Sequence, residues 1–399
     1  MKAKTVSIVH EDSRMAGREV AQELLDALER RPDLVLLFAP TEVYDHHALL
    51  EELRASLGPE VRIAGCTSAA EIGQNGELIG SVTAMGLSLQ GDGDPIEVEV
   101  FSAQIDDVPG AFPGEDESFR LGRALGEQLS SFGPRLVMLF PDGVFSMPAE
   151  VIRGLQQAAG VDFPIVGGCA GEREFKMSHT AQFVGDRVLS RGAVAVGFRG
   201  PLRIQCAAGT GFQPLGRERI CTKVEGKFVV EIDGEPALEM YRQLLGDEVE
   251  QPAFGIAHPL AMLPPDASGD SWSTQGFVIR AVQRSDERGA LQCGGWVHEG
   301  ARVRITRATR EQLLAGAVET WDRALAKLPS PELAFFYSCA GRKMILGPRH
   351  FHAEMERVLA GLPDELPRIG FYTYGELAPL GGAAMHHDET FTVVLMSRE

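Results

Sequence analysis

The chain has 399 residues and a formal net charge of −18, and it contains no run of five or more basic residues. Such a surface excludes nucleic acid and anionic membranes as partners, because both are bound through clustered lysine and arginine side chains. Hydrophobic residues make up 44% of the chain, which predicts a globular protein whose core is divided among two or three domains.

The N-terminal ten residues lack the apolar stretch of a signal peptide, and no segment approaches the roughly 20 apolar residues of a membrane helix. The cysteines show neither a CxxC pair nor the spacing of a zinc site. We therefore expect reduced thiols and a cytoplasmic location. The six cysteines are Cys66, Cys169, Cys206, Cys221, Cys293 and Cys339.

In chain order, the first predicted unit opens with the apolar run 34–38, which is typical of a buried strand. A leucine-rich helix near 50–57 follows, then a strand over 62–68 that ends in small residues, and then a strand over 82–89. The same order returns twice. The corresponding segments are 136–140, 151–159, 164–169 and 194–198 in the second unit, and 333–337, 351–362, 367–373 and 391–395 in the third.

Gly65, Gly167 and Gly370 take the same place in the three units. Duplication of a βαββ unit explains this better than a chance likeness among ordinary α/β units, which is the alternative. The last strand of each unit follows a loop and not a helix, so mixed sheets are expected. The predicted fold class is α/β (α+β), with layered mixed β-sheets flanked by helices and built from repeated βαββ units.

Strands and turns dominate the region 202–307, where Asp233-Gly234 is a hairpin-turn signal. A helix over 309–328 then carries an apolar stripe that includes Trp321 and is typical of a core-facing helix. Surface loops are expected where Gly, Pro, Ser and Asp accumulate, at 90–95, 108–117 and 264–273.

The most specific strings lie near the C-terminus: YSCAGR at 337–342, GFYTYGELAP at 370–379 and MHHDETF at 385–391. Together with GCTSAAEI at 65–72 and PIVGG at 164–168, they resemble the FIST family, described as F-box and intracellular signal transduction proteins. The resemblance covers nearly the whole chain. It implies an N-terminal FIST domain over 1–200 and a C-terminal FIST domain over 201–399.

The resemblance implies a sensory module that binds a small, amino-acid-like ligand. Its output is expected to pass through a separate signalling protein, such as a histidine kinase or a cyclic-di-GMP enzyme. A subset of similar bacterial proteins binds haem and senses nitric oxide, so a haem-binding nitric oxide sensor is the first alternative. Many relatives carry His-Asn where this chain has His386-His387. The candidate haem ligands are His258, His386 and His387.

The candidate ligand site lies at the ends of the strands of the third unit. Cys339 and Arg342 follow one strand, and such strand ends line the ligand crevice in layered α/β folds. The Arg342 guanidinium suits a ligand carboxylate, although a buried ion pair with Glu376 is the alternative. A common pocket for Arg342 and Tyr374 is expected, because the two strands should be parallel neighbours.

Strand alternation places Tyr372, Tyr374 and Glu376 on one face. With His386 from the loop before the last strand, these side chains would suit a small zwitterion, or else form an internal hydrogen-bond network. Glu71 takes nearly the same place in the first unit. A second, pseudo-symmetric site is therefore predicted at Cys66, Thr67, Ser68 and Glu71.

A Cys-dependent acyl or amide hydrolase is the second alternative, because Cys339, Glu376 and His386 fall in one C-terminal neighbourhood. A cysteine nucleophile needs a nearby base and a lowered thiol pKa. No nucleophile-elbow motif is present, so binding without catalysis is the favoured interpretation.

Overall fold

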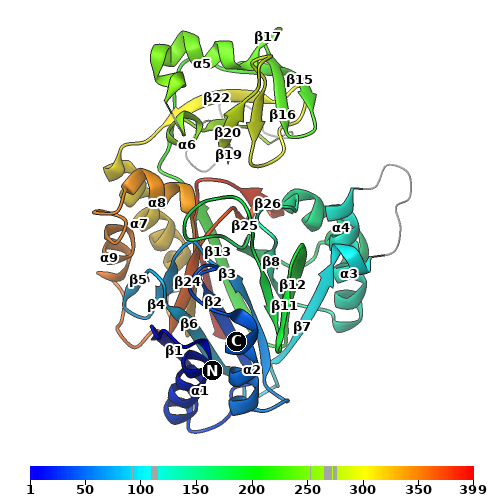
Figure 1. The fold of residues 1–399 in the computed structure, drawn as a ribbon, viewed down its shortest axis with the longest axis vertical. Coiled ribbons are helices and arrows are strands. Elements are labelled where there is room, and N and C mark those ends of the chain that lie inside the picture. Colours follow the sequence, from blue (N-terminus) through cyan, green and yellow to red (C-terminus); the bar gives the residue numbers. More distant parts are fainter. Residues whose placement is uncertain (92, 109–115, 252, 265–271, 273–275) are drawn as a thin grey trace.

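The computed structural model describes the whole chain except residues 92, 109–115, 252, 265–271 and 273–275, so parts of the three expected loops lie outside the described residues. The chain forms a body of three units and an insertion that sits on one end of it (Figure 1). No helix in the described part has the length and apolar character that crossing a membrane requires.

Each unit of the body contains the predicted βαββ elements, preceded by a further strand and helix and interrupted by a short hairpin. The first unit comprises β1 (Lys2–Ile8), α1 (Ser13–Leu28), β2 (Leu34–Ala39), α2 (His46–Leu57), β3 (Arg62–Thr67), the hairpin β4 (Glu71–Gly73) and β5 (Gly76–Leu78), and β6 (Val82–Ser88).

The other two units repeat this order. The second comprises β7 (Glu97–Gln104), α3 (Glu117–Phe132), β8 (Leu136–Pro141), α4 (Pro148–Ala159), β9 (Ile165–Gly168), β10 (Gln182–Val184), β11 (Arg187–Leu189) and β12 (Gly192–Arg199). The third comprises β13 (Leu202–Gly209), α7 (Arg310–Lys327), β23 (Leu333–Cys339), α8 (Ala340–Leu346), α9 (Ala353–Leu359), β24 (Arg368–Thr373), β25 (Glu376–Leu380), β26 (Ala383–His387) and β27 (Phe391–Arg398).

The three units interlock by exchanging their hairpins. The hairpin β4–β5 joins the sheet of the third unit through β24, β10–β11 joins the first sheet through β3, and β25–β26 joins the second sheet through β9. Within each sheet the two strands that flank the helix are parallel and the last strand is antiparallel, as β2, β3 and β6 illustrate. The predicted mixed sheets and repeated units are confirmed. Two of the three sheets of the body, those that hold β25–β26 and β4–β5, combine strands from both sides of residue 200.

Equivalent residues of the units meet at the centre of the body. Phe38, Phe140 and Tyr337 hold the same position on β2, β8 and β23, and they form one cluster with Phe371. The ring centroids of Phe38 and Phe371 are 4.3 Å apart. All of these side chains are buried, so each sheet contributes its apolar face to one shared core.

Register explains the repeated glycines. Gly65, Gly167 and Gly370 lie beside the equivalent residues Leu37, Leu139 and Phe336 of the neighbouring parallel strands. A Cβ on these glycines would lie 1.8, 2.3 and 1.9 Å from the carbonyl oxygen of that neighbour. Because the obstacle is backbone, no side-chain rotation can relieve it.

We expect Gly370→Ala to lower the free energy of unfolding by roughly 1–3 kcal/mol, the usual cost of overpacking a core. Urea unfolding of the purified protein measures this. Gly361→Ala is the matched control in the same unit, because a Cβ at Gly361 would meet no atom within 4 Å. Equal midpoints for the two variants would show that β24 can shift to admit the methyl group.

The insertion connects β13 to α7 and is built on a nine-stranded sheet. Asp233 and Gly234 both have left-handed backbone, with φ of 54° and 83°, and they join β16 to β17 as the predicted hairpin turn. The elements are β14 (Gln213–Pro214), β15 (Arg219–Glu225), β16 (Phe228–Ile232), β17 (Glu235–Pro236), α5 (Ala237–Leu245), α6 (Phe254–Ala257), β18 (Leu260–Met262), β19 (Val278–Arg280), β20 (Val282–Ser285), β21 (Leu291–Cys293) and β22 (Arg302–Arg307).

Helix α7 returns the chain from the insertion to the body. Thr309 caps it in a capping box with Gln312, which satisfies backbone N–H groups at the helix start. Its apolar stripe, including the buried Trp321, packs in the core of the third unit. The predicted core-facing helix over 309–328 is confirmed.

Candidate functional site

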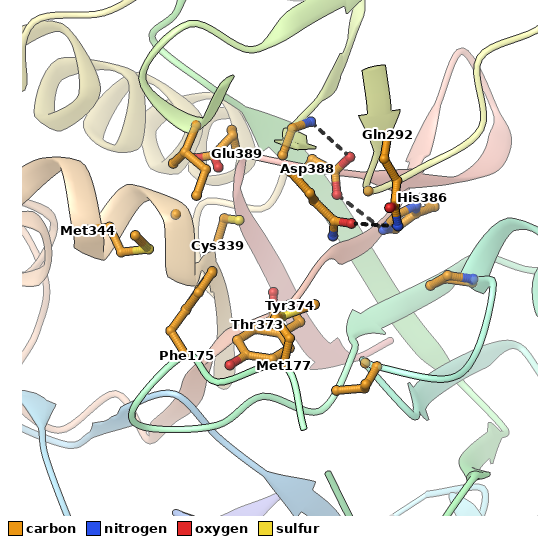
Figure 2. A pocket seen from close by; sticks show the side chains of 18 of the residues that line it. Phe175, Met177, Gln292, Cys339, Met344, Thr373, Tyr374, His386, Asp388 and Glu389 are labelled. Carbon is orange, nitrogen blue, oxygen red and sulfur yellow. Dashed lines mark hydrogen bonds and ion pairs between the residues drawn. The ribbon is translucent and has the colours of Figure 1, made fainter. Parts of the chain in front are cut away.

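A cavity of about 600 Å³ lies between the body and the insertion, a size suited to a small organic ligand. Its body side follows the ends of β8, β23 and β24 and the turn between β26 and β27, and its insertion side includes β20 and β21. Figure 2 shows the labelled side chains converging on this space from both sides. The lining residues used below are Phe175, Met177, Lys227, Cys339, Met344, Tyr374, His386, Asp388 and Glu389.

Asp388 ties the insertion to the wall of the cavity. Its Oδ2 accepts a hydrogen bond from the backbone N–H of Ala281 at 3.2 Å, and its Oδ1 lies 3.5 Å from His386 Nε2 (Figure 2). Burial raises the pKa of Asp388 to about 6 even though Arg280 and Lys227 oppose the rise. The carboxyl therefore titrates close to neutral pH.

His386 is buried, and neither ring nitrogen has a hydrogen-bond partner among the described residues. Two glycines make room for the ring, because a Cβ on Gly375 or Gly295 would lie 2.3 or 2.9 Å from its nitrogens. Burial, with Arg280 nearby, holds the pKa of His386 well below its usual range. A neutral imidazole of this kind carries one donor and one acceptor.

Glu389 has a strained backbone and a buried carboxyl group, one oxygen of which is unpaired in the described part of the chain. It has a left-handed backbone, with φ of 55°, at a position where the first unit has Gly80 and the second has Arg191. Its side chain is buried and one oxygen, Oε2, has no hydrogen-bond partner among the described residues. Burial, with Glu376 and Asp388 nearby, raises its pKa well above the ordinary value. Strain and unsatisfied polar atoms of this kind cluster at functional sites.

Tyr374 forms the opposite wall with Phe175, and their ring centroids are 4.9 Å apart. The Tyr374 hydroxyl donates to Glu172 Oε2 at 3.2 Å. The same carboxylate accepts hydrogen bonds from Ser178 and His179, and so it fixes the loop that carries Phe175 and Met177. This wall offers aromatic and thioether surface to a ligand.

The structure corrects the expected position of Arg342. The side chain is fully buried and does not reach the cavity that Tyr374 lines. It pairs with Glu354 at 2.6 Å, and not with Glu376 as the alternative had it. The reason is that α9 brings Glu354 beside Ser338 of β23 and Arg342 of α8. The local sequence around Arg342 gives no sign of this contact.

Strand alternation fails after Thr373. Strand β24 ends there, Gly375 has a φ of 148°, and Glu376 opens β25 in a different sheet. Tyr372 therefore points into the core, where its hydroxyl donates to Glu354 at 3.2 Å, while Tyr374 reaches the cavity. Glu376 is fully buried and outside the cavity lining.

Glu376 belongs to a hydrogen bond that all three units repeat. The backbone N–H of Thr390 donates to Glu376 at 3.1 Å, that of Ser81 donates to Glu71 at 3.1 Å, and that of Gly192 donates to Gln182 at 3.3 Å. The three acceptors hold equivalent positions on the exchanged hairpins. Because the neutral Gln182 makes the same contact, the bond joins each hairpin to the last strand of its own unit without needing a charge.

The predicted second site is filled by its own side chains. Cys66, Thr67, Ser68 and Glu71 are buried in the first unit and line none of the large cavity. Ser68 donates to Glu71 at 2.6 Å, and Thr67 accepts from the backbone of Ala181. These contacts satisfy the polar atoms internally.

The three candidate haem ligands have different surroundings. His258 is paired with Glu248 at 3.3 Å, and His387 contacts the carbonyl of Ala378 at 3.1 Å. Of the three, His386 lines the cavity. Across the described residues, no three His, Cys, Asp or Glu side chains gather in a metal-binding group.

Cys339 lines the cavity, but burial and the neighbouring Glu376 and Glu389 raise its pKa well above the ordinary value. A nucleophilic cysteine needs the opposite shift. All six cysteines lie among the described residues, and all are free thiols. The geometry therefore does not favour the hydrolase alternative.

Sequence reasoning missed Asp388, Glu389, Lys227 and Phe175. A signal was available for Glu389, because aligning the three units places it opposite Gly80. Glycine adopts the left-handed backbone conformation without strain. A charged residue at a position where another copy has glycine therefore marks a strained backbone. No comparable signal existed for Lys227, which arrives from the insertion.

A family profile described as the FIST N domain matches residues 33–235, and one described as the FIST C domain matches residues 237–379. An uncharacterized protein of Mycobacterium tuberculosis is 30% identical over 278 residues, 65% of this chain and 67% of that protein. One of Methanocaldococcus jannaschii is 22% identical over 259 residues, 58% and 48% of the two chains. The crystal structure of a cyanuric acid hydrolase from A. caulinodans aligns with 100% of this chain and 99% of that chain at a TM-score of 0.40 and 8% identity, too slight a likeness to indicate activity.

Proposed function

Because the chain belongs to the FIST family, whose domains are generally sensory, we propose that it senses a small molecule bound in the cavity between body and insertion. One observation carries the proposal. Glu389 and His386 are buried at the cavity wall with polar atoms that no described residue satisfies. Such atoms destabilise a protein unless a ligand or water completes them.

The lining favours a zwitterion with an apolar part. Glu389 is placed to accept hydrogen bonds from an ammonium group, and Lys227 supplies a cation for a carboxylate. Phe175, Met177 and Met344 offer apolar surface for the rest of the ligand. An amino-acid-like molecule meets all three demands, and a purely apolar ligand would leave the buried charges unpaired.

The sensor acts in the cytoplasm and passes its state to a separate signalling protein, such as a histidine kinase or a cyclic-di-GMP enzyme. Support for this step comes from the family. Capture of the tagged protein from its native cells, with and without the ligand, followed by mass spectrometry, tests it. Recovery of the same proteins with an untagged control would count against a specific partner.

The residues do not fit the haem alternative. His387 Nε2 already contacts the carbonyl of Ala378, and His258 lies beside Glu248 and outside the cavity lining. The His386 ring is enclosed by Gly375 and Gly295. The polar carboxyl groups of Asp388 and Glu389 beside it are poor neighbours for the apolar faces of a haem. Adding hemin and recording the absorption spectrum tests this directly, and a stable Soret band lost in His386→Ala would revive the nitric oxide sensor.

Binding is tested by isothermal titration with the twenty protein amino acids, one at a time. For the amino acid that binds best, we expect Glu389→Gln to weaken affinity by roughly ten- to a hundredfold, since a charged hydrogen bond contributes about 1.5–3 kcal/mol. Glu71→Gln is the matched control, because Glu71 is a buried acid that makes the equivalent hairpin bond in the first unit and lies outside the lining. If no amino acid binds, or if both variants bind alike, the proposed ligand class is wrong.

A further inference from the structure

Two segments of the chain connect the insertion to the body, and they contact each other. We call these two segments the crossings. The outgoing chain leaves β13 through Thr210 and Gly211, and the returning chain enters α7, whose first turn contains Gln312 and Leu313. Gly211 has a left-handed φ of 88°, and a Cβ there would lie 2.3 Å from the carbonyl oxygen of Gln312. Any rotation of the insertion relative to the body would therefore have to change the contact between Gly211 and Gln312.

Arg342 binds both crossings at once. Its guanidinium donates to the carbonyl oxygen of Thr210 and, at 2.9 Å, to that of Leu313. The remaining donors hold Glu354, at 2.6 and 3.0 Å, so the group is anchored in the body. A planar cation with several fixed donors can hold two carbonyls and a carboxylate in one geometry, which a more flexible lysine cannot reproduce.

The outgoing crossing is also hydrogen-bonded to a residue that lines the cavity. The Thr210 hydroxyl donates to the backbone carbonyl of Glu389 at 2.8 Å. Thr210 thus contacts Arg342 through its carbonyl and the cavity residue through its side chain. Glu389, which lines the cavity, is therefore one hydrogen bond away from the crossings.

The segment that ends at Glu389 also docks the insertion. Arg280 of β19 donates to the carbonyl of His386 at 3.0 Å, and Ala281 donates to Asp388. Residues 386–389 therefore contact the cavity, the docked face of the insertion and, through Thr210, its crossings. A shift of this segment on ligand binding would change the contacts at the docked face of the insertion and at its crossings.

We infer that Arg342 is a positioning residue that locks the crossings of the insertion, and that residues 386–389 transmit cavity occupancy to this lock. The second half of this inference rests on the proposed function. The first half concerns the ligand-free protein and stands or falls without any ligand. Arg342 in this role contacts no ligand, and it sets how often the insertion leaves its docked position.

Amide hydrogen exchange of the ligand-free, full-length protein tests the lock. We expect Arg342→Lys to speed exchange at Ala281 by roughly tenfold or more, because about 1.4 kcal/mol corresponds to a factor of ten and a charged hydrogen bond is worth at least that. Thr210→Val should act in the same direction while leaving the Arg342–Glu354 pair intact. The amide of Tyr372, bonded inside the body to Ala70 at 2.8 Å, should exchange as in the unaltered protein.

Arg368→Lys is the matched control, because Arg368 is a buried arginine of the same unit whose bonds to Gln74 and Pro363 stay within the body. It should leave the Ala281 amide unchanged. Equal acceleration at Ala281 and Tyr372 in Arg342→Lys would mean a merely structural arginine and overturn the inference, as would unchanged exchange at Ala281 in both Arg342→Lys and Thr210→Val. Failure of every amino acid to bind would refute the ligand proposal and leave these exchange results standing.

Discussion

Replacing Glu376 with glutamine is expected to remove a large part of the loss of stability that the protein suffers between pH 5 and pH 9. Burial raises the pKa of Glu376 to about 8, against hydrogen bonds from Thr373 and Thr390 that lower it. The folded protein then keeps a proton that the unfolded chain releases near pH 4.5. Stability therefore is greatest below the unfolded pKa and falls as the pH rises through the folded one.

The magnitude follows from the size of the shift. At about 1.4 kcal/mol for each pKa unit, ionising Glu376 in place costs on the order of 4 kcal/mol by pH 9. Glu71 and Glu77, whose pKa values burial raises to about 7 and about 8, add to the same trend. Glutamine keeps the shape and cannot ionise, so Glu376→Gln should match the unaltered protein at pH 5 and exceed its stability at pH 9.

Urea unfolding at a series of pH values between 5 and 9 measures the effect. The second unit supplies the reciprocal control, because Gln182 already makes the equivalent bond as a neutral side chain. Gln182→Glu should add a pH dependence of the kind that Glu376→Gln removes. Parallel stability curves for all three proteins would show that Glu376 is ionised in the folded state at neutral pH.

The body could be predicted from the sequence because its signals are local. Apolar runs such as 34–38, 136–140 and 333–337 became buried strands, and the repeated glycines marked equivalent places in them. The exchanged hairpins could not be predicted in this way. Their strands β4 and β10 are three residues long, and their partners lie in other units, so only the assembled body gives them a sheet to join.

The site was harder to predict because neighbours in the chain separate in space. Tyr372 and Tyr374 stand two positions apart, yet the first enters the core and the second the cavity. The strand ends between them, and alternation holds only within a strand. Arg342 looked like a ligand contact from its place after β23, and the residue that decides its role, Glu354, comes from a helix that follows twelve positions later.

Arg342→Ala is expected to destabilise the protein by roughly 3–5 kcal/mol, the cost of breaking a buried ion pair from one side. Arg342 and Glu354 are both fully buried. The substitution removes the guanidinium donor from the Glu354 carboxylate, which keeps hydrogen bonds from Ser338 and Tyr372, and it removes the same donor from the carbonyls of Thr210 and Leu313. Several buried acceptors would therefore lose partners at once.

A surface pair in the same unit calibrates this loss. Arg357 and Glu311 are 2.6 Å apart, with 42% and 70% of their side chains exposed, and exposed pairs of this kind contribute about 0–1 kcal/mol. Urea unfolding of Arg342→Ala and Arg357→Ala under the same conditions gives the comparison. Equal, small losses would mean that water or a rearranged side chain replaces the guanidinium between the crossings and Glu354. A large loss for Arg342→Ala alone would show that the buried pair at the crossings contributes far more stability than the exposed pair, as expected of a contact that restrains the insertion in a sensor.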